Sequence, residues 1–243
     1  MPYQKKVIWP KQLSLVLPAY NEAGRLPRAL TICHQWSKKF SGWEFIFVND
    51  GSSDAGESLI LASKFKLISY PTNRGKGYAV KTGVAAATKP LVLVADIDFS
   101  TPLSEIPKFY QVIRTGADVA SGSRKLAGAK LLKLQPKMRQ WLGEQFTHLT
   151  NLWLGMRVSD FTCGFKLFLA PAAKKLFGLS RISRWGYDAE ILFLAKVLGY
   201  QLVEVPVTWE NDERTRVNIL LDVLRSLGDL IAIRWNQLRG KYA

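Results

Sequence analysis

Residues 91–100, LVLVADIDFS, decide the fold class of this chain. The first five are apolar, which predicts a short buried strand, and the polar turn that follows contains the carboxylates of Asp96 and Asp98. Comparable apolar runs predict further strands at 13–17, 45–48, 67–69 and 119–121. Helical patterns separate these runs, and the alternation predicts an α/β fold with a mainly parallel sheet flanked by helices.

Four of the predicted strands lead directly into polar turns. These turns read PAYNE (18–22), NDGSSD (49–54), NRGKG (73–77) and DIDFS (96–100). Ligands of open α/β sheets bind beyond the carboxyl ends of the strands. We therefore expect the four turns to form one binding site at a single edge of the sheet.

The second half of the chain is dominated by two amphipathic patterns. Apolar residues recur at helical spacing over 137–156, after Pro136, and again over 217–238. Between these two helices the sequence predicts strands at 161–169 and 201–207 and a helix at 188–198. No repeat or low-complexity linker interrupts the chain, so we expect residues 1–243 to form one domain.

The net charge of +15 indicates an anionic partner. Nucleic acid, anionic lipid headgroups and phosphorylated small molecules all satisfy that condition. A basic nucleic-acid-binding module is one alternative, but no reading motif is present and the four polar turns stay unexplained by it. With no apolar run of 18 residues, no leader pattern and two separated cysteines, the sequence predicts a cytoplasmic protein with reduced thiols.

Oxygen ligands are the main chemical signal of the turns. Asp96 and Asp98 come just past a strand, where both carboxylates can reach a hard cation such as Mg²⁺ or Mn²⁺. Asp50 also follows a strand, and its carboxylate can accept a hydrogen bond from a nucleobase N–H or close its own loop as an Asx-turn. The glycines and cations of 73–77 suit a phosphate but match neither the Walker nor the dinucleotide-binding pattern.

Taken in order, these motifs resemble those of the family 2 inverting glycosyltransferases, which have the GT-A fold. The four turns and GSR (122–124) carry that resemblance. The segments DFTCGFKLF (160–168), RWGYDAE (184–190) and DLIAIR (229–234) are similar to the dolichyl-phosphate β-glucosyltransferase branch. Related mannosyl enzymes place a glutamine where this chain has Ser100, and eukaryotic members of the branch usually begin with a membrane helix that is not seen here.

The resemblance implies a role for each candidate residue. The implied nucleotide-sugar site consists of Pro18, Tyr20, Glu22, Asp50, Gly51, Arg74, Lys76 and Asp96. The implied metal ligands are Asp96 and Asp98. Arg124, Lys166 and Arg216 are implied at the acceptor phosphate, and Asp98, Arg124, Asp188 and Arg216 as the catalytic set, in which Asp188 meets the sugar at a helix start.

The implied reaction moves a hexose, expected to be glucose from UDP-glucose, to a polyprenyl phosphate with inversion, as in lipid-linked protein glycosylation. The alternative within the family is a mannosyltransferase that uses GDP-mannose. A lipid acceptor also gives the amphipathic helices a second reading beside core packing, because tryptophans among cations suit a membrane interface. We therefore expect a peripheral protein on the cytoplasmic face of a membrane, with Mg²⁺ or Mn²⁺ as cofactor.

Overall fold

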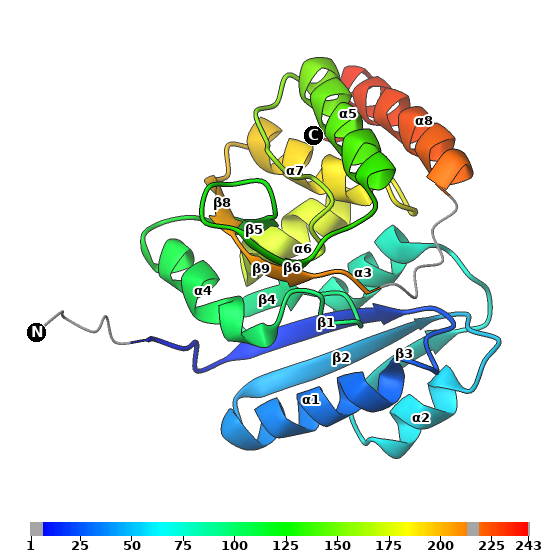
Figure 1. The fold of residues 1–243 in the computed structure, drawn as a ribbon, viewed down its shortest axis with the longest axis vertical. Coiled ribbons are helices and arrows are strands. Elements are labelled where there is room, and N and C mark those ends of the chain that lie inside the picture. Colours follow the sequence, from blue (N-terminus) through cyan, green and yellow to red (C-terminus); the bar gives the residue numbers. More distant parts are fainter. Residues whose placement is uncertain (1–6, 213–218, 243) are drawn as a thin grey trace, which may run out of the picture.

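The computed structural model describes residues 7–212 and 219–242. In this part of the chain a seven-stranded sheet has the order β3-β2-β1-β4-β7-β5-β8 (Figure 1). Its strands are β1 (Leu13–Ala19), β2 (Trp43–Asp50), β3 (Lys66–Tyr70), β4 (Leu91–Val94), β5 (Val119–Ser123), β7 (Lys166–Leu169) and β8 (Leu202–Pro206). The predicted strands are thus present, with ends that differ by a few residues.

One strand runs against the others. β7 pairs antiparallel with both β4 and β5, whereas every other pair in the sheet is parallel. The strand predicted at 161–169 begins only at Lys166, because Asp160 holds the preceding residues in a turn through a hydrogen bond from the Thr162 N–H at 3.1 Å. An antiparallel strand starts at the edge where parallel strands end, so this turn lies at the edge predicted for ligands.

Alternating side chains divide the core into two layers. In β1, Leu13, Leu15 and Leu17 pack on one face of the sheet, while Val16 packs on the other. The first face is covered by α1 (Leu26–Lys39), α2 (Gly56–Ala62) and α4 (Ile106–Arg114), which follows the short 3₁₀ helix η1 (Leu103–Glu105). The second face is covered by α3 (Lys76–Ala85), α6 (Ala170–Leu179) and α7 (Tyr187–Val197). Helices on both faces confirm the predicted α/β fold.

The two amphipathic segments form helices that lie side by side beyond α7 (Figure 1). α5 (Lys137–Leu154) begins after Pro136, as expected, and ends at Gly155, whose φ of 64° suits glycine. α8 spans Ile219–Leu238, and the first two residues of the predicted helix, 217–218, lie outside the described residues. The indole N–H of Trp153 donates to the carbonyl of Leu230 at 3.0 Å and joins the two helices.

A second, two-stranded sheet was not predicted. β6 (Lys130–Lys133) pairs in parallel with β9 (Thr208–Glu210). It brings the segment before α5 next to the segment that follows β8. The two cysteines, Cys33 and Cys163, are buried and unpaired, so the expectation of free thiols is confirmed.

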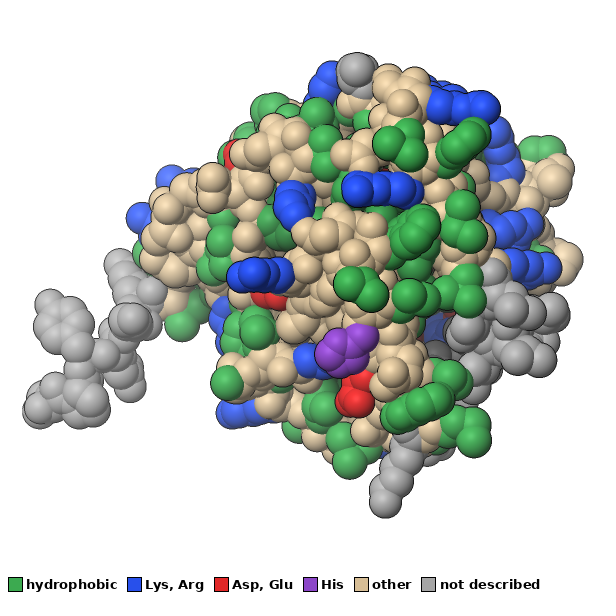
Figure 2. All heavy atoms as spheres, turned by 90° about the horizontal axis from the view of Figure 1, so that it is seen from above, with side chains coloured by type: hydrophobic (Ala, Val, Ile, Leu, Met, Phe, Trp, Pro, Cys, Tyr) green, Lys and Arg blue, Asp and Glu red, His purple; other side chains and the backbone are tan. Residues whose placement is uncertain are grey.

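The outer side of α5 and α8 carries many exposed apolar side chains. Trp141 is 58% exposed, Leu152 83%, Ile231 61% and Trp235 53%. Figure 2 views the molecule from the end where these helices lie and shows hydrophobic side chains interspersed with lysines and arginines. No helix among the described residues is long and apolar enough to cross a membrane.

Candidate active site

The turn after β4 holds the predicted metal ligands in a strained conformation. Phe99 has a φ of 50°, which is unusual for a bulky residue, and its N–H donates to the carbonyl of Asp96 at 3.1 Å. The N–H of Ser100 donates to Asp98 Oδ1 at 2.9 Å. Such backbone strain is often found at functional sites, where the surrounding structure maintains it.

Two hollows flank this turn. Asp96 lines one of them with Gly164, and Asp98 lines the other, which has a volume of about 330 Å³. Phe99 and Ser100 contribute to both. The hollow beside Asp96 has a volume of only about 10 Å³, so the larger hollow beside Asp98 is the one with room for part of a ligand.

Asp96 lies among positive charges. Lys76, the first residue of α3, places its Nζ 2.5 Å from Asp96 Oδ1. Burial opposes ionisation of Asp96, but the ammonium of Lys76 prevails and lowers the pKa of this carboxyl below its ordinary value. The charges of Lys166 and Arg124 also lower the pKa of Asp96. The residues predicted for the nucleotide sugar and those predicted for the acceptor phosphate are therefore close enough to interact electrostatically.

Asp98 differs from Asp96 in its electrostatics. Burial raises its pKa, and the nearby negative charge of Asp96 raises it further. A bound cation would reduce the repulsion between the two carboxylates. The pair therefore favours the binding of a positive charge.

Gly164, which comes just before β7, completes the surroundings of Asp96. A Cβ added to this glycine would fall 2.1 Å from Asp96 Oδ2 and 2.6 Å from Cγ. The backbone of the 160–165 turn thus closes directly over the carboxylate. No larger residue leaves room for this arrangement.

Asp50 is buried and joins two of the polar turns. Its Oδ1 accepts from the N–H of Arg74 at 2.8 Å, and its Oδ2 accepts from the N–H of Gly75 at 2.9 Å and from the Asn73 side chain at 2.8 Å. Gly51 allows the two turns to approach this closely, because its φ is 67° and a Cβ added to it would fall 2.6 Å from the backbone nitrogen of Asn73. Asp50 therefore fixes the neighbouring loop, and its predicted contact with a nucleobase stays a prediction.

The remaining nucleotide-site residues lie at the ends of β1 and β3. Tyr20 is 45% exposed, whereas Glu22 forms an ion pair with Arg25 at 2.9 Å. Pro18 is a strand residue opposite Val48 in the register of β1 and β2. The guanidinium of Arg74 lies 3.5 Å from the centroid of the Tyr78 ring.

Arg124 is held by the turn before β7. Its Nε donates to Asp160 at 2.7 Å, and its Nη2 donates to Asp160 at 2.8 Å and to Thr162 at 2.7 Å. Burial raises the pKa of Asp160, but the guanidinium outweighs it and brings the pKa down to about 2. Among the described residues Nη1 has no hydrogen-bond partner, so this end of the guanidinium can receive a phosphate oxygen.

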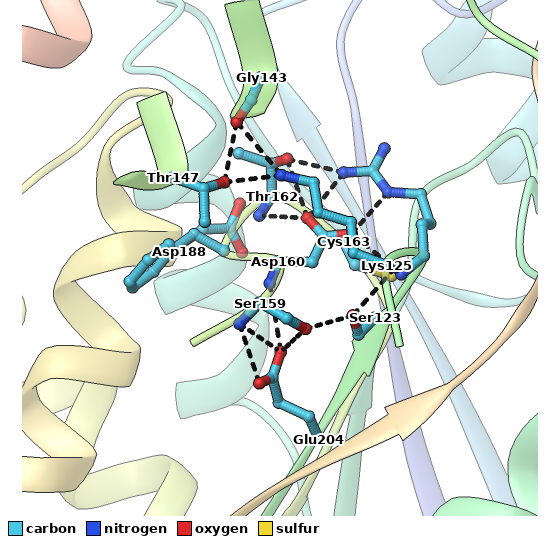
Figure 3. A network of polar contacts seen from close by, with 12 residues as sticks. Ser123, Lys125, Gly143, Thr147, Ser159, Asp160, Thr162, Cys163, Asp188 and Glu204 are labelled. Carbon is cyan, nitrogen blue, oxygen red and sulfur yellow. Dashed lines mark hydrogen bonds and ion pairs between the residues drawn. The ribbon is translucent and has the colours of Figure 1, made fainter. Parts of the chain in front are cut away.

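A polar network continues from Asp160, the partner of Arg124, to neighbouring elements (Figure 3). Glu204 of β8 accepts from the N–H groups of Ser159 and Asp160, and so fixes the start of the turn. On the other side Lys125 donates to Thr147 of α5 at 2.9 Å. The network thereby connects α5 to the residues that orient Arg124.

Lys166 has a different environment from the one expected of a ligand-binding lysine. It is 3% exposed, and its ammonium reaches Asp188 Oδ1 at 2.5 Å and the carbonyls of Cys163 and Phe161 at 2.6 and 3.2 Å. These three acceptors match the three donors of the ammonium. The geometry favours a positioning role for Lys166, which orients Asp188 at the start of α7, over the direct phosphate contact that we predicted.

Other residues near the site have roles that the sequence did not reveal. Asp160, Gly164 and Trp185 are in this group; the Trp185 ring lies 5.2 Å from Lys76 Nζ. All three belong to segments that carried the family resemblance, but buried contacts leave no signal of their own in a sequence. Arg216, predicted at the acceptor phosphate, lies outside the described residues.

The residues present fit a divalent cation. Within the described ranges no group of three or more His, Cys, Asp or Glu side chains is placed to hold a metal, so the protein would offer the two carboxylates of Asp96 and Asp98. Mg²⁺ commonly binds through one or two carboxylates, with water and substrate phosphates completing its shell. The hard oxygen donors and the hollows beside them are suited to that mode.

Comparison with known proteins identifies the class. Residues 14–177 match the profile of "Glycosyl transferase family 2", and the chain belongs to this family of enzymes. The dolichyl-phosphate beta-glucosyltransferase of Dictyostelium discoideum is 30% identical over 247 residues, which cover 94% of this chain and 75% of that protein. The Drosophila melanogaster protein of the same name is 32% identical, with 95% and 77% covered. The predicted family is confirmed.

Solved structures agree with the assigned fold. Glucosyl-3-phosphoglycerate synthase from Mycobacterium tuberculosis, in complex with Mn²⁺, UDP and glucosyl-3-phosphoglycerate, has a TM-score of 0.69 at 18% identity. That match covers 91% of this chain and 79% of the synthase. Mannosyl-3-phosphoglycerate synthase from Rubrobacter xylanophilus has the same TM-score at 16% identity, with 95% and 74% covered. The GT-A fold that the resemblance implied is confirmed.

Proposed function

We propose that this enzyme transfers glucose from UDP-glucose to a polyprenyl phosphate with inversion, giving a β-linked polyprenyl phosphosugar and UDP. The observation that carries the proposal is the similarity to dolichyl-phosphate beta-glucosyltransferases over nearly the whole chain. The cations beside Asp96 and at Arg124 support the proposal, because Lys76 would suit a diphosphate and Arg124 would suit the phosphate of an acceptor.

On the donor side, Asp96 and Asp98 would bind Mg²⁺ or Mn²⁺, which when bound stabilises the negative charge of the departing diphosphate. Lys76 lies beside these carboxylates and adds a further positive charge for the diphosphate. Asp50 keeps the Arg74 and Gly75 backbone in place near the nucleoside. Asp188, paired with Lys166, would contact the sugar.

On the acceptor side, Arg124 would bind the phosphate with the Nη1 end of its guanidinium, while Asp160 fixes the other end. A phosphate is already anionic at neutral pH and is a competent nucleophile. Catalysis therefore depends on positioning and on charge stabilisation, and no strong general base is required.

A lipid acceptor also gives a function to the exposed side of α5 and α8. Large apolar side chains and cations are combined there, as in surfaces that lie on anionic membranes. We assign this surface to the cytoplasmic face of a membrane. Lys125 links it to Arg124, so the acceptor phosphate would be received close to the headgroup region.

The test is nucleotide release from a panel of UDP-glucose, UDP-galactose and GDP-mannose, with a short polyprenyl phosphate as acceptor. We expect UDP release from UDP-glucose, loss of release with EDTA, and loss in Asp98→Ala with the fold intact. Asp118→Ala, at the opposite end of β5, is the control and should retain activity. Release from GDP-mannose alone would support the mannosyltransferase alternative, and release that ignores EDTA would contradict the metal assignment.

A further inference from the structure

The Lys76 ammonium occupies an oxygen that a metal ion would also use. It lies 2.5 Å from Asp96 Oδ1, and the two side chains are only 19% and 37% exposed. An ion pair that is partly withdrawn from water is screened less than a surface pair. A cation that approaches Asp96 therefore meets a competitor of the same sign.

Lys76 is held in this position by the loop on either side of it. A Cβ added to Gly75 would fall 2.5 Å from the carbonyl oxygen of Ser183, and one added to Gly77 would fall 2.6 Å from the Tyr187 Cβ. The Tyr78 N–H donates to the Ser183 carbonyl at 3.0 Å. The start of α3 is thus packed tightly, and the lysine emerges from it at a fixed point.

The turn before β7 and the Trp185 ring also lie close to this ion pair. Oδ2 lies close to Gly164, where an added Cβ would fall 2.1 Å from it. The centroid of the Trp185 ring lies 5.2 Å from Lys76 Nζ. A metal ion that binds Asp96 through Oδ1 must share this oxygen with Lys76 or displace the ammonium, and two cations at one oxygen repel each other strongly.

We propose that Lys76 is the resident counter-cation of Asp96, and that it yields this place to a divalent cation only when a nucleoside diphosphate offers the ammonium new oxygen partners. The inference rests on the proposed role of Asp96 and Asp98 as metal ligands. Lys76 then makes metal binding conditional on the nucleotide: the metal alone binds weakly, and metal and diphosphate bind together.

The experiment measures Mn²⁺ binding by calorimetry and by the electron paramagnetic resonance of free Mn²⁺, with and without UDP, and needs neither sugar nor acceptor. In Lys76→Met we expect Mn²⁺ to bind the protein alone about tenfold more tightly than it binds wild type. The factor by which UDP improves Mn²⁺ affinity should fall by a similar amount, since couplings of this size are typical. Lys76→Gln should behave like Lys76→Met, and Lys76→Arg like wild type.

Lys81→Met is the matched control. Lys81 lies on the same helix, but its ammonium binds the carbonyls of Gly178 and Ser180 and has no contact with Asp96. Its loss removes one positive charge and should leave Mn²⁺ affinity unchanged. A gain of affinity in the Lys76 variants cannot come from general damage to the fold, which would weaken binding.

Two results would overturn the inference, and they differ in what else they affect. If wild type binds Mn²⁺ with UDP while Lys76→Met and Lys76→Gln show no gain in affinity for Mn²⁺ alone, Lys76 is not a competitor and the proposed function stands. If wild type fails to bind Mn²⁺ even with UDP, the metal role of Asp96 and Asp98 fails as well.

Discussion

Gly164→Ala is a test of how closely the turn before β7 must approach the Asp96 carboxylate, the proposed metal ligand. The added Cβ would lie 2.1 Å from Asp96 Oδ2, 2.6 Å from Cγ and 2.9 Å from Oδ1, so the whole carboxyl group is in conflict with it. These separations must grow to at least about 3 Å, which forces Asp96 out of its rotamer or moves the turn. A displacement of about 1 Å in a positioning group can lower the rate by about 100-fold, or about 2.7 kcal/mol in the activation free energy.

The assay is the rate of UDP release together with the affinity for UDP in the presence of Mn²⁺. The control is Gly178→Ala in α6, where an added Cβ has no neighbour within 4 Å and the helix should gain about 1 kcal/mol of stability. We expect both rate and affinity to fall in Gly164→Ala and to persist in Gly178→Ala. Wild-type values for both quantities in Gly164→Ala would show that the close approach has no role in the site.

Two further predictions concern the ion pair of Arg124 and the surface of α5. Asp160→Asn leaves the Arg124 guanidinium without its charged partner, and we expect the free energy of unfolding in urea at pH 7 to fall by about 3 kcal/mol. Because Arg124 lowers the pKa of Asp160 to about 2, against the opposing effect of burial, the pair stabilises the fold fully above about pH 4. That contribution should disappear as the pH falls through 2, and an Asp160→Asn variant with an unchanged pH profile would refute the coupling. Trp141→Asp on α5 should reduce co-sedimentation with anionic liposomes severalfold at low salt, since it removes an exposed ring that can enter the lipid interface. Leu61→Asp on α2, equally exposed on another side of the molecule, should bind as wild type does, and equal losses in both variants would contradict the assigned membrane surface.

Apolar runs and polar turns were sufficient to predict most of the sheet. Leu91–Val94 was evident because a fully buried strand needs apolar side chains on both faces. The direction of β7 could not be predicted, since its four residues carry no signal of orientation. Its start was misplaced because the apolar residues before Lys166 are buried in a turn, and burial alone does not distinguish a turn from a strand.

The sequence supplied the candidate side chains of the site but did not show which of them contact each other. The pattern after β4 predicted Asp96 and Asp98 as metal ligands, the glycines of 73–77 predicted Lys76 near a phosphate, and the structure brings Lys76 and Asp96 together. A sequence lists charges without showing which of them meet, so the partnership of Arg124 with Asp160, 36 residues apart, had to come from the fold. The buried pair of Lys166 and Asp188 was missed for the same reason, and a lysine expected at the ligand was found in the interior.

The antiparallel course of β7 has a consequence for engineering chimaeras of this enzyme. The chain returns to the ligand edge through the turn before β7, so Asp160 and Gly164 meet Arg124 and Asp96 from the first half. A junction between Arg124 and α5 would exchange the second half of the chain for that of a relative and leave the four polar turns of the first half intact. Both contacts cross such a junction, so recombinants should work only when the two halves supply a matching aspartate and arginine and retain a glycine over the carboxylate.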